Sequence, residues 1–460
     1  MNEYQNENRM APSCHPNMIW VFADQLRAQA LGCNGDPNVH TPNLDMLSQT
    51  GIQVEGGVSG MPLCCPFRGS LLSGRYPHHA VPGHELRLPP EMPTVADAFG
   101  EQGYETAYFG KWHLDGLENG DGTCERYVIP RERRGHFQTW IGYENNNSQF
   151  NTWVHGHRRR KEGEEEIPLT RLDGYETDRL TDLMVSFLRQ EHEQPFFAVL
   201  SVQPPHDPHF APEEDMRRHT PGEIQLRANV PPIPRIEERA RRHIAGYYAQ
   251  IENLDRNVGR ILDVLEETGL ADNTHIVFFS DHGEMMGSHG QFRKMSPYEE
   301  SIRIPVIFSG GRRTAYKPGL KGSYREKVCF NHVDFAPTSL GLCGLSVPDW
   351  MEGTDYSWIR IAGKERSQKE MTSAYLQSVI PTRHFDSVDK PFRGVVTEDG
   401  WKYVCLEHCE WMLFHVAEDP YELVNYAHEQ LYLAKRRELY DLLKHWMEKT
   451  GDSFALPPRP

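Results

Sequence analysis

The sequence has no long apolar run. Its 460 residues include no stretch of about 18 apolar residues, the length that a membrane-spanning helix needs. The segment before Met18 is polar and lacks the apolar region, between a basic start and a small-residue cleavage site, that marks a signal peptide. We therefore expect a cytoplasmic protein without a membrane segment, or a periplasmic protein if a leader has been removed.

Positive charge and cysteine are also scarce. With 49 Lys and Arg against 65 Asp and Glu, the formal net charge is −16, which argues against a nucleic acid partner because phosphates need a basic face. A small anionic substrate remains compatible with this charge, since a local cluster of basic side chains can dominate one cleft. The nine cysteines are odd in number and scattered, which fits a reducing compartment better than a disulfide framework.

Apolar runs alternate with amphipathic stretches along most of the chain. Buried strands are predicted at Met18–Ala23, Phe196–Leu200 and Thr274–Phe279, and helices at Tyr175–Arg189 and Glu238–Thr268. This order predicts an α/β fold with a large, mostly parallel central sheet flanked by helices. The three strands run into Asp24, the segment with His206, and Asp281. Loops beyond the carboxyl ends of parallel strands line the ligand crevice, so these three residues are expected to share one site.

The pattern changes after Trp358. Short strands are predicted at Phe392–Val396, Trp401–Leu406 and Trp411–Val416, and a closing helix around residues 439–446. We therefore predict a catalytic domain over residues 1–365 and a smaller C-terminal subdomain over 366–460, built from an antiparallel sheet plus a helix.

The most informative segment is Pro62–Pro77, which reads P-L-C-C-P-F-R-G-S-L-L-S-G-R-Y-P. It contains C-x-P-x-R followed by L-x-G-R, and only Cys64 has proline two residues on and arginine four residues on. The segment resembles the signature of type I, formylglycine-dependent sulfatases of the alkaline phosphatase superfamily. Cys65 and Phe67 occupy variable positions of that motif. The alternative interpretation is a buried cysteine pair at the start of a helix.

Further segments follow in the order of the same family, and the resemblance covers nearly the full length. They are Asp24-Gln25, G-K-W-H-L at 110–114, P-P-H-D-P at 204–208, S-D-H-G at 280–283, the lysine at 294, P-Y-E-E-S-I-R-I-P-V at 297–306 and E-D-P-Y-E-L near 420. The resemblance implies an alkaline phosphatase-like fold and a sulfuric ester hydrolase. The catalytic residues that it implies are Cys64, Arg68, Lys111, His113, His206 and Lys294.

The resemblance also implies how these residues act. A formylglycine-generating maturation enzyme would oxidise Cys64 to Cα-formylglycine, whose hydrate attacks sulfur to form a covalent sulfo-enzyme. Arg68 and Lys111 would hold the diol, and His113 would act as the base that regenerates the aldehyde. The sulfate oxygens would contact His206 and Lys294, one of which protonates the departing alcohol.

Sulfate ester hydrolysis requires charge neutralisation and an activated oxygen nucleophile, and a divalent cation can supply both. The expected metal ligands are Asp24, Gln25, Cys64, Asp281 and His282. Gln25 replaces a second aspartate of the family pattern, and His282 stands where asparagine is frequent. Hard oxygen ligands favour Ca²⁺, whereas the imidazole makes Mn²⁺ or another divalent ion the alternative.

Two segments bear on the substrate. Arg134–Gly156 is dense in aromatic and amide side chains, which suit either sugar binding or an ordinary loop packed on the core. The basic run Arg158–Lys161, followed at once by four glutamates within residues 162–166, predicts a solvated loop. His84 and His289 are further candidates for the cleft.

We expect a small sulfated substrate, most simply a saccharide, and the oligomeric state stays open. The first alternative is a phosphonate monoester or phosphodiester hydrolase with the same nucleophile, because a sulfate monoester and a phosphodiester carry similar charge. The second is a catalytically silent metal-binding protein in which Cys64 stays a thiol.

Overall fold

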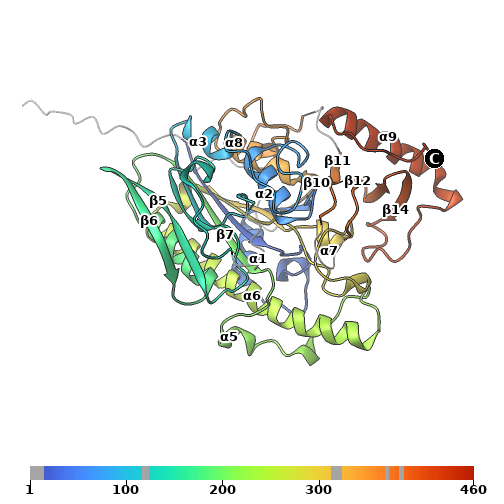
Figure 1. Ribbon diagram of the computed structural model, residues 1–460, viewed down its shortest axis with the longest axis horizontal. Coiled ribbons are helices and arrows are strands. Elements are labelled where there is room, and N and C mark those ends of the chain that lie inside the picture. The colour runs from blue at the N-terminus through green and yellow to red at the C-terminus, as the bar shows by residue number, and fades with distance from the viewer. Residues whose placement is uncertain (1–14, 117–123, 312–323, 368–371, 383–387) are drawn as a thin grey trace, which may run out of the picture.

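The fold is built on one large sheet, seen in a computed structural model that describes residues 15–116, 124–311, 324–367, 372–382 and 388–460. Within these residues ten strands pair in the order β10-β2-β9-β8-β1-β7-β3-β4-β5-β6 (Figure 1). They are β1 (Asn17–Asp24), β2 (Ile52–Val58), β3 (Glu105–Lys111), β4 (Thr139–Tyr143), β5 (Thr152–Arg160), β6 (Gly163–Leu172), β7 (Phe196–Pro205), β8 (Thr274–Ser280), β9 (Val306–Gly310) and β10 (Tyr324–Asn331).

The middle of the sheet is parallel. Strands β8, β1, β7, β3 and β4 pair in parallel with one another, whereas β9 pairs antiparallel with β8, and β5 pairs antiparallel with β4 and β6. The predicted strands at β1, β7 and β8 are confirmed, although β7 continues five residues further, to Pro205. The carboxyl ends of the parallel strands therefore meet at one edge of the sheet.

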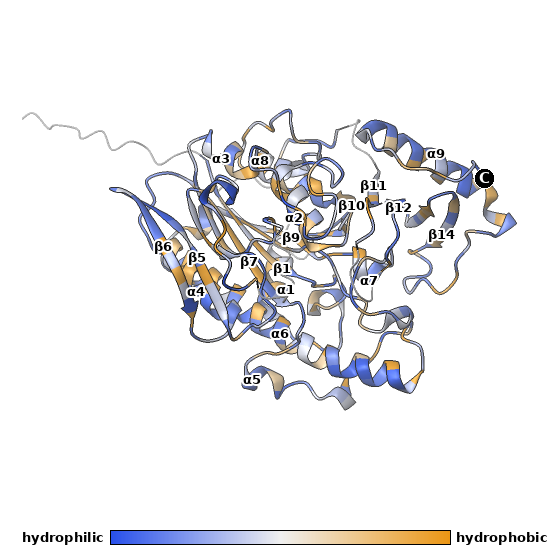
Figure 2. Ribbon diagram, in the orientation of Figure 1, coloured by the Kyte–Doolittle hydropathy of each residue, from blue (hydrophilic) through white to orange (hydrophobic). Residues whose placement is uncertain are grey.

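Both faces of the sheet are covered, as the continuous apolar runs predict. In β1, Met18, Trp20 and Phe22 pack on one face with residues of α2, α3 and α8, while Ile19 and Val21 pack on the other with residues of α1, α4 and α6. Every residue of β1 is buried. The central strands carry the most hydrophobic segments of the chain (Figure 2). Burial on both faces explains why the strands show no polar alternation.

The helices that cover the sheet vary widely in length. They are α1 (Pro42–Thr50), α2 (Cys64–Ser73), α3 (Val95–Gly100), α4 (Glu176–Leu188), α5 (Glu213–Met216), α6 (Pro234–Glu267), α7 (Glu299–Ile302) and α8 (Phe335–Leu342). The predicted helix at Glu238–Thr268 is confirmed as α6 and begins four residues earlier. A proline suits this first helical position because its missing N–H has no partner there in any case.

The acidic and basic run after residue 157 is not the predicted loop. Strands β5 and β6 form an antiparallel hairpin in which Arg158 pairs with Glu165 and Arg159 with Glu164. Opposite charges that face each other across two antiparallel strands stabilise their pairing. Strand β6, at the edge of the sheet, is largely exposed on both faces. The charge pattern therefore marks an edge hairpin.

The smaller C-terminal sheet is confirmed. It consists of β11 (Ser373–Ser378), β12 (Phe392–Thr397), β13 (Trp401–Leu406) and β14 (Cys409–His415), all antiparallel, with α9 (Leu433–Thr450) packed on it. Lys402 of β13 forms buried ion pairs with Glu299 of α7 and with Glu422. The first pair joins the smaller sheet to α7. The domain division near residue 365 stays a prediction.

None of the helices in the described part of the chain combines the length and apolarity needed to cross a bilayer. The polar segment before Met18, on which the localisation expectation rests, falls mainly on residues 1–14, outside the described residues.

Candidate active site

The site begins with the helix that carries the motif. Cys64 is the first residue of α2, whose ten residues are all buried. Pro66 lies in the first turn, where its missing N–H removes no helical hydrogen bond. Gly69 is required by packing, because a Cβ there would lie 2.5 Å from Val81 Cγ2. The helix ends at Gly74, which has φ of +67°. The N-terminus of α2 is thereby fixed against the carboxyl edge of the sheet.

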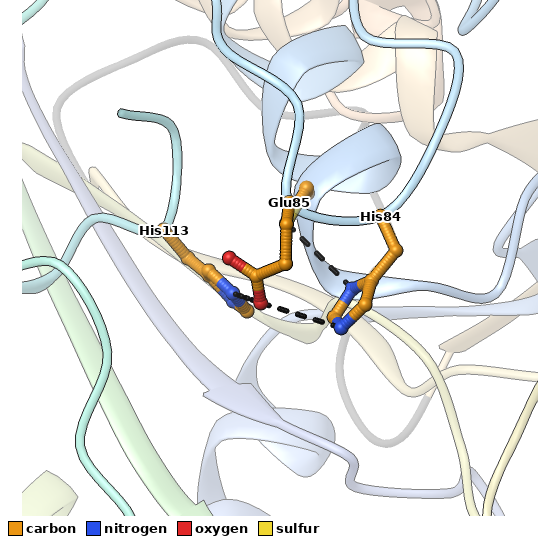
Figure 3. A group of neighbouring side chains, drawn as sticks. His84, Glu85 and His113 are labelled. Carbon is orange, nitrogen blue, oxygen red and sulfur yellow. Dashed lines mark hydrogen bonds and ion pairs between the residues drawn. The ribbon is translucent and has the colours of Figure 1, made fainter. Parts of the chain in front are cut away.

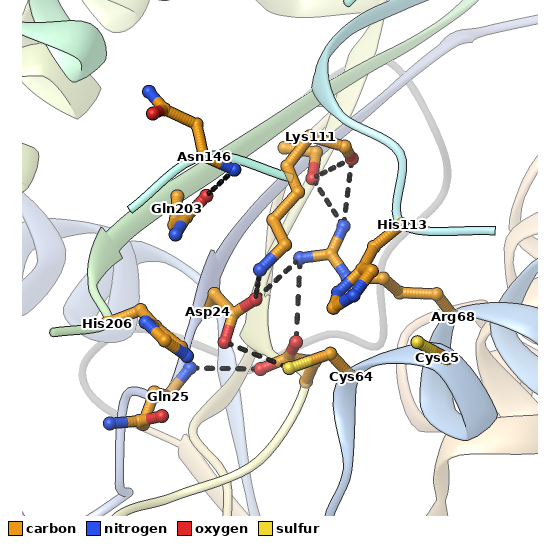
Figure 4. A network of polar contacts seen from close by, with 12 residues as sticks. Asp24, Gln25, Cys64, Cys65, Arg68, Lys111, His113, Asn146, Gln203 and His206 are labelled. Atoms are coloured by element: carbon orange, nitrogen blue, oxygen red, sulfur yellow. Dashed lines mark hydrogen bonds and ion pairs between the residues drawn. The ribbon is translucent and has the colours of Figure 1, made fainter. Parts of the chain in front are cut away.

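Asp24, the last residue of β1, is surrounded by cations. Its Oδ2 lies 3.1 Å from Arg68 Nη2 and 2.8 Å from Lys111 Nζ (Figure 4). Burial alone would raise the pKa of this carboxyl, but the surrounding cations, Lys111 first among them, hold it well below its usual range. Asp24 is therefore a carboxylate at neutral pH.

Arg68 links four strands of the sheet. Its Nη1 donates to the carbonyl of Lys111 and to Ser201 Oγ, each at 2.9 Å, and its Nη2 reaches Asp24 and, at 3.5 Å, Asp281 Oδ2. These groups lie at or near the ends of β1, β3, β7 and β8. The guanidinium thus fixes the edge of the sheet around the N-terminus of α2.

Asp281 directly follows β8 and faces Asp24. Its Oδ1 accepts hydrogen bonds from the backbone N–H of Gln25, at 2.9 Å, and of His282, at 2.8 Å. Burial and the neighbouring Asp24 raise the pKa of Asp281 to about 6. Two buried carboxylates this close repel each other, so the pair favours a bound cation.

The thiol of Cys64 lies among these groups. Its Sγ is 3.2 Å from His282 Nε2, 3.3 Å from Lys294 Nζ and 3.6 Å from Asp24 Oδ1. Burial opposes a thiolate, but Lys294 and Lys111 outweigh it and lower the pKa of the thiol well below its usual value. The position therefore favours a negative group.

His113 approaches from the Cys65 side. Its Nε2 lies 2.9 Å from Glu85 Oε1, and Glu85 also contacts His84 (Figure 3). Burial lowers the pKa of His113, but Cys65 and Glu85 raise it well above its usual value. Glu85 therefore orients the imidazole of His113 and favours its protonated form.

His206 and Lys294 lie on the opposite side of Cys64. Lys294 Nζ donates to Gln25 Oε1 at 2.8 Å. Burial and the nearby Lys294 lower the pKa of His206 well below its usual value. The imidazole is then neutral, and its Nδ1 donates to the carbonyl of Asp207 at 2.7 Å.

The residues expected as metal ligands fit a divalent cation. One ligand atom each from Asp24, Cys64, Asp281 and His282 lie within 4.8 Å of one another, and all four residues are buried. Gln25 adds an amide oxygen, held by Lys294 and by its own Nε2, which donates to Glu284 Oε2 at 2.6 Å. The donor set of two carboxylates, an amide and an imidazole suits Ca²⁺ or Mn²⁺.

The structure brings all the predicted site residues together. Three residues that support the site were not predicted from the sequence: Glu85 beside His113, Glu284 beside Gln25, and Ser201 beside Arg68. Glu284 directly follows the S-D-H-G segment, so its position was a usable signal. Glu85 carries no such signal, because only the tertiary fold places it against His113.

The aromatic segment Arg134–Gly156 is mainly part of the core. Trp140 and Tyr143 are buried in β4, and Asn146 bonds to the end of β7 through its backbone N–H and Gln203 Oε1, at 3.1 Å. Asn147 remains exposed. The packing explanation therefore holds for the aromatic residues of β4.

A parallel sheet whose strand ends bring carboxylates, lysines and one buried thiol together defines an enzyme that acts on an anionic ester. Comparison with known proteins makes this specific. The family profile for sulfatases matches residues 16–345, and a profile described as N-sulphoglucosamine sulphohydrolase, C-terminal, matches residues 287–449. The chain belongs to the sulfatase family, and it is a sulfuric ester hydrolase.

The similarity to known proteins extends over most of each chain. The chain is 32% identical to an ulvan-active sulfatase of Formosa agariphila, with 95% of this chain and 82% of the relative covered. The crystal structure of the YidJ protein from Bacteroides fragilis superposes with a TM-score of 0.83 at 28% identity, covering 98% and 99% of the two chains. The phosphonate monoester hydrolase of Agrobacterium radiobacter has a TM-score of 0.73, with 95% and 96% covered, and at 22% identity it shows the shared fold alone.

Proposed function

We propose that this enzyme hydrolyses a sulfate monoester on a saccharide, using a formylglycine formed from Cys64 and a divalent cation. The observation that carries the proposal is the surroundings of Cys64 Sγ, which lies within 3.6 Å of Asp24, His282 and Lys294. A hydrated aldehyde at this position would supply an oxygen nucleophile. Positive and negative groups both surround this side chain, as attack on the anionic sulfate group requires.

The neighbours of position 64 have separate tasks. Arg68 and Lys111 hold Asp24 and keep positive charge beside the nucleophile. His113, oriented by Glu85, is the base that removes a proton from the residue at 64, and because its pKa is raised it must first lose its own proton. This pairing keeps the imidazole in one orientation.

Sulfate binding and proton donation fall to the opposite side. Lys294 and His206 would contact the sulfate oxygens. Nδ1 of a neutral His206 donates to the carbonyl of Asp207, so its Nε2 must take up a proton before it can donate to a sulfate oxygen. The ammonium of Lys294 is then the group that protonates the departing alcohol.

The cation would be held by Asp24, Gln25, Asp281, His282 and the residue at 64. A divalent ion in this position would neutralise charge on sulfate oxygens and favour a deprotonated nucleophile. We propose Ca²⁺ because oxygen ligands predominate, with Mn²⁺ as the alternative because of the imidazole.

A saccharide is the proposed substrate because a relative is active on ulvan and a matching profile describes an N-sulphoglucosamine enzyme. The second candidate is a phosphonate monoester or phosphodiester hydrolase, favoured by the similar fold of the Agrobacterium enzyme. Turnover of an aryl sulfate and an aryl phosphonate by one preparation decides between them, since the preferred substrate should be faster by at least about tenfold.

The nucleophile is tested by mass spectrometry of the tryptic peptide that ends at Arg68, which should lose about 18 Da when a thiol becomes an aldehyde. The protein should be co-expressed with a maturation enzyme, and turnover should rise in proportion to the modified fraction. Turnover that is unrelated to this fraction would overturn the formylglycine mechanism.

The cytoplasmic location also remains a proposal, which cell fractionation would test.

A further inference from the structure

We propose that Cys65, His84, Glu85 and His113 form a second metal site, which binds zinc and thereby inhibits the enzyme. One ligand atom from each of the four residues lies within 4.8 Å of the others. The group is separate from the cluster around Cys64 and shares no residue with it. Three of its members are seen together in Figure 3, with Glu85 between the two histidines.

The distances fit a single ion after small side-chain movements. Glu85 Oε1 lies 2.9 Å from His113 Nε2 and 3.3 Å from His84 Nε2, and Cys65 Sγ lies 4.0 Å from His84 Nδ1. Ligand atoms around tetrahedral zinc, with bonds of about 2.0–2.3 Å, lie roughly 3.3–3.8 Å apart. A single ion takes only one nitrogen of His84, so this partly exposed ring must rotate to bring that nitrogen toward both Glu85 and Cys65.

The chemistry of the donors selects zinc. A thiolate, two imidazoles and a carboxylate are borderline or soft ligands of the kind that Zn²⁺ prefers over Ca²⁺. The charges also balance, because one thiolate and one carboxylate neutralise a divalent ion. Binding would release the thiol proton of Cys65 and the extra proton of His113 to solvent. The cluster around Cys64, richer in oxygen, would keep its preference for a harder ion.

A second observation points to a ligand. Glu85 Oε2 is buried and has no hydrogen-bond partner among the described residues, although buried polar atoms are normally satisfied. The nearby ammonium of Lys111 is already paired with Asp24 at 2.8 Å. The side chains of His84 and Glu85 are 24% and 18% exposed, so an ion can enter from solvent.

Bound zinc would occupy His113, the proposed base, and stop the step that needs it. Only this inhibition rests on the proposed function, because zinc binding requires nothing but the four side chains. Binding and inhibition can therefore be measured separately. Cys65 occupies a variable position of the motif and has no assigned part in catalysis, which makes Cys65→Ser the decisive variant.

Zinc binding should be measured by competition with a chromophoric chelator, on the full chain with saturating Ca²⁺. We expect one zinc ion per chain, bound at least about 100-fold more weakly by Cys65→Ser because a thiolate ligand is lost. His84→Gln should also weaken binding, by about tenfold or more. Thermal unfolding of each variant shows whether it is folded. Equal affinity in the wild type and in both folded variants would overturn the site.

Cobalt identifies the ligand. Co²⁺ bound to a thiolate gives a near-ultraviolet charge-transfer band, which the wild type should show and Cys65→Ser should lose. Cys64→Ala should retain the band, since Cys64 belongs to the other cluster. A band that disappears with Cys64 and survives the loss of Cys65 would contradict the proposal.

Inhibition completes the test. Zinc should lower turnover of an aryl sulfate by at least about tenfold in the wild type and by less than twofold in Cys65→Ser at the same concentration. Zinc that binds through Cys65 without lowering turnover would support the site and contradict the assignment of His113 as the base. Inhibition that is equal in both proteins would overturn the inhibitory role of this site.

Discussion

Two of the buried clusters of opposite charges among the described residues differ in what they surround. In the active-site cluster, Arg68, Lys111 and Lys294 face Asp24 and Asp281 across the thiol of Cys64. In the C-terminal cluster, Lys402 bridges Glu299 and Glu422, and Arg303 Nε lies 2.7 Å from Glu299 Oε2. Both clusters are almost fully hidden from solvent.

The difference lies in how the charges are used. Lys402 joins β13 to α7, so the C-terminal cluster connects the smaller sheet to a helix that lies just before β9. Arg303 and Lys402 hold the pKa of Glu299 at about 2 although burial opposes this. Around Cys64, the two carboxylates instead lie close together and favour a cation from solution. Buried charge alone therefore does not identify a catalytic site.

The largest effect should come from removing the nucleophile. Cys64→Ala should lower turnover by roughly 10⁴-fold or more, because the attacking group is lost, while the free energy of unfolding changes by less than about 1 kcal/mol. Steady-state kinetics and urea unfolding measure the two quantities. Cys65→Ser is the matched control and should keep turnover within about threefold. Substantial turnover by Cys64→Ala would contradict the proposed mechanism.

Removal of divalent cations should come next. Chelation should lower turnover by about 10³-fold, and Ca²⁺ should restore it. Lys402→Met should respond to the chelator as the wild type does, because Lys402 lies in the C-terminal cluster and pairs with Glu299 and Glu422, none of them a proposed ligand of the cation. Full activity after exhaustive chelation, checked by elemental analysis, would show that the carboxylate pair does not hold a catalytic ion.

Breaking the C-terminal cluster should affect stability and leave the chemistry intact. Lys402→Met leaves Glu299 and Glu422 without their shared partner, and breaking a buried pair in this way costs about 3–5 kcal/mol of unfolding free energy. Turnover of the folded fraction should change less than about threefold. Lys444→Met is the control: its exposed pair with Glu448 spans 3.7 Å and should contribute less than about 0.5 kcal/mol. Equal stability losses would remove the distinction.

The smallest effect should appear in acid. Burial opposes ionisation of Asp452, but hydrogen bonds from Arg393 lower its pKa from 3.8 to about 2. Since the folded pKa lies below the unfolded one, this carboxylate stabilises the fold above about pH 4, and its contribution is lost as pH falls toward 2.

Asp452→Asn should therefore cost about 1–2 kcal/mol at pH 6 and progressively less toward pH 3. Urea unfolding at several pH values measures the difference. A cost that does not depend on pH would show that the ionised form contributes nothing. Turnover at pH 6 should stay within about twofold of the wild type, because Asp452 belongs to the C-terminal region.

Much of the sheet was predictable because its central strands are continuous apolar runs, as at β1 and β8. The hairpin of β5 and β6 was not, since β6 lies at an edge with most of its residues exposed and offers no apolar face to detect. Its pairing places opposite charges on either side of a tight turn, and the same run of charges is also typical of a solvated loop.

The residues of the active site were likewise predictable only in part. Asp24, His206 and Asp281 were predictable as a group because each follows a strand of one parallel sheet. Glu85 was not, because its contact with His113 depends on two loops whose residues adopt φ of +51° and +56°, a conformation that non-glycine side chains rarely take. The sequence carries no local pattern for such backbone angles.

The burial of α2 also determines that Cys64 must be oxidised before the chain has folded. Cys64 is only 1% exposed in the folded chain, so a second enzyme could not reach its thiol without displacing the helix from the sheet. Under the proposed function, oxidation and folding therefore compete once in the life of each molecule. A purified preparation would record the result of that competition as a fixed mixture of active and inactive chains, and later incubation with the maturation enzyme would not change its ratio.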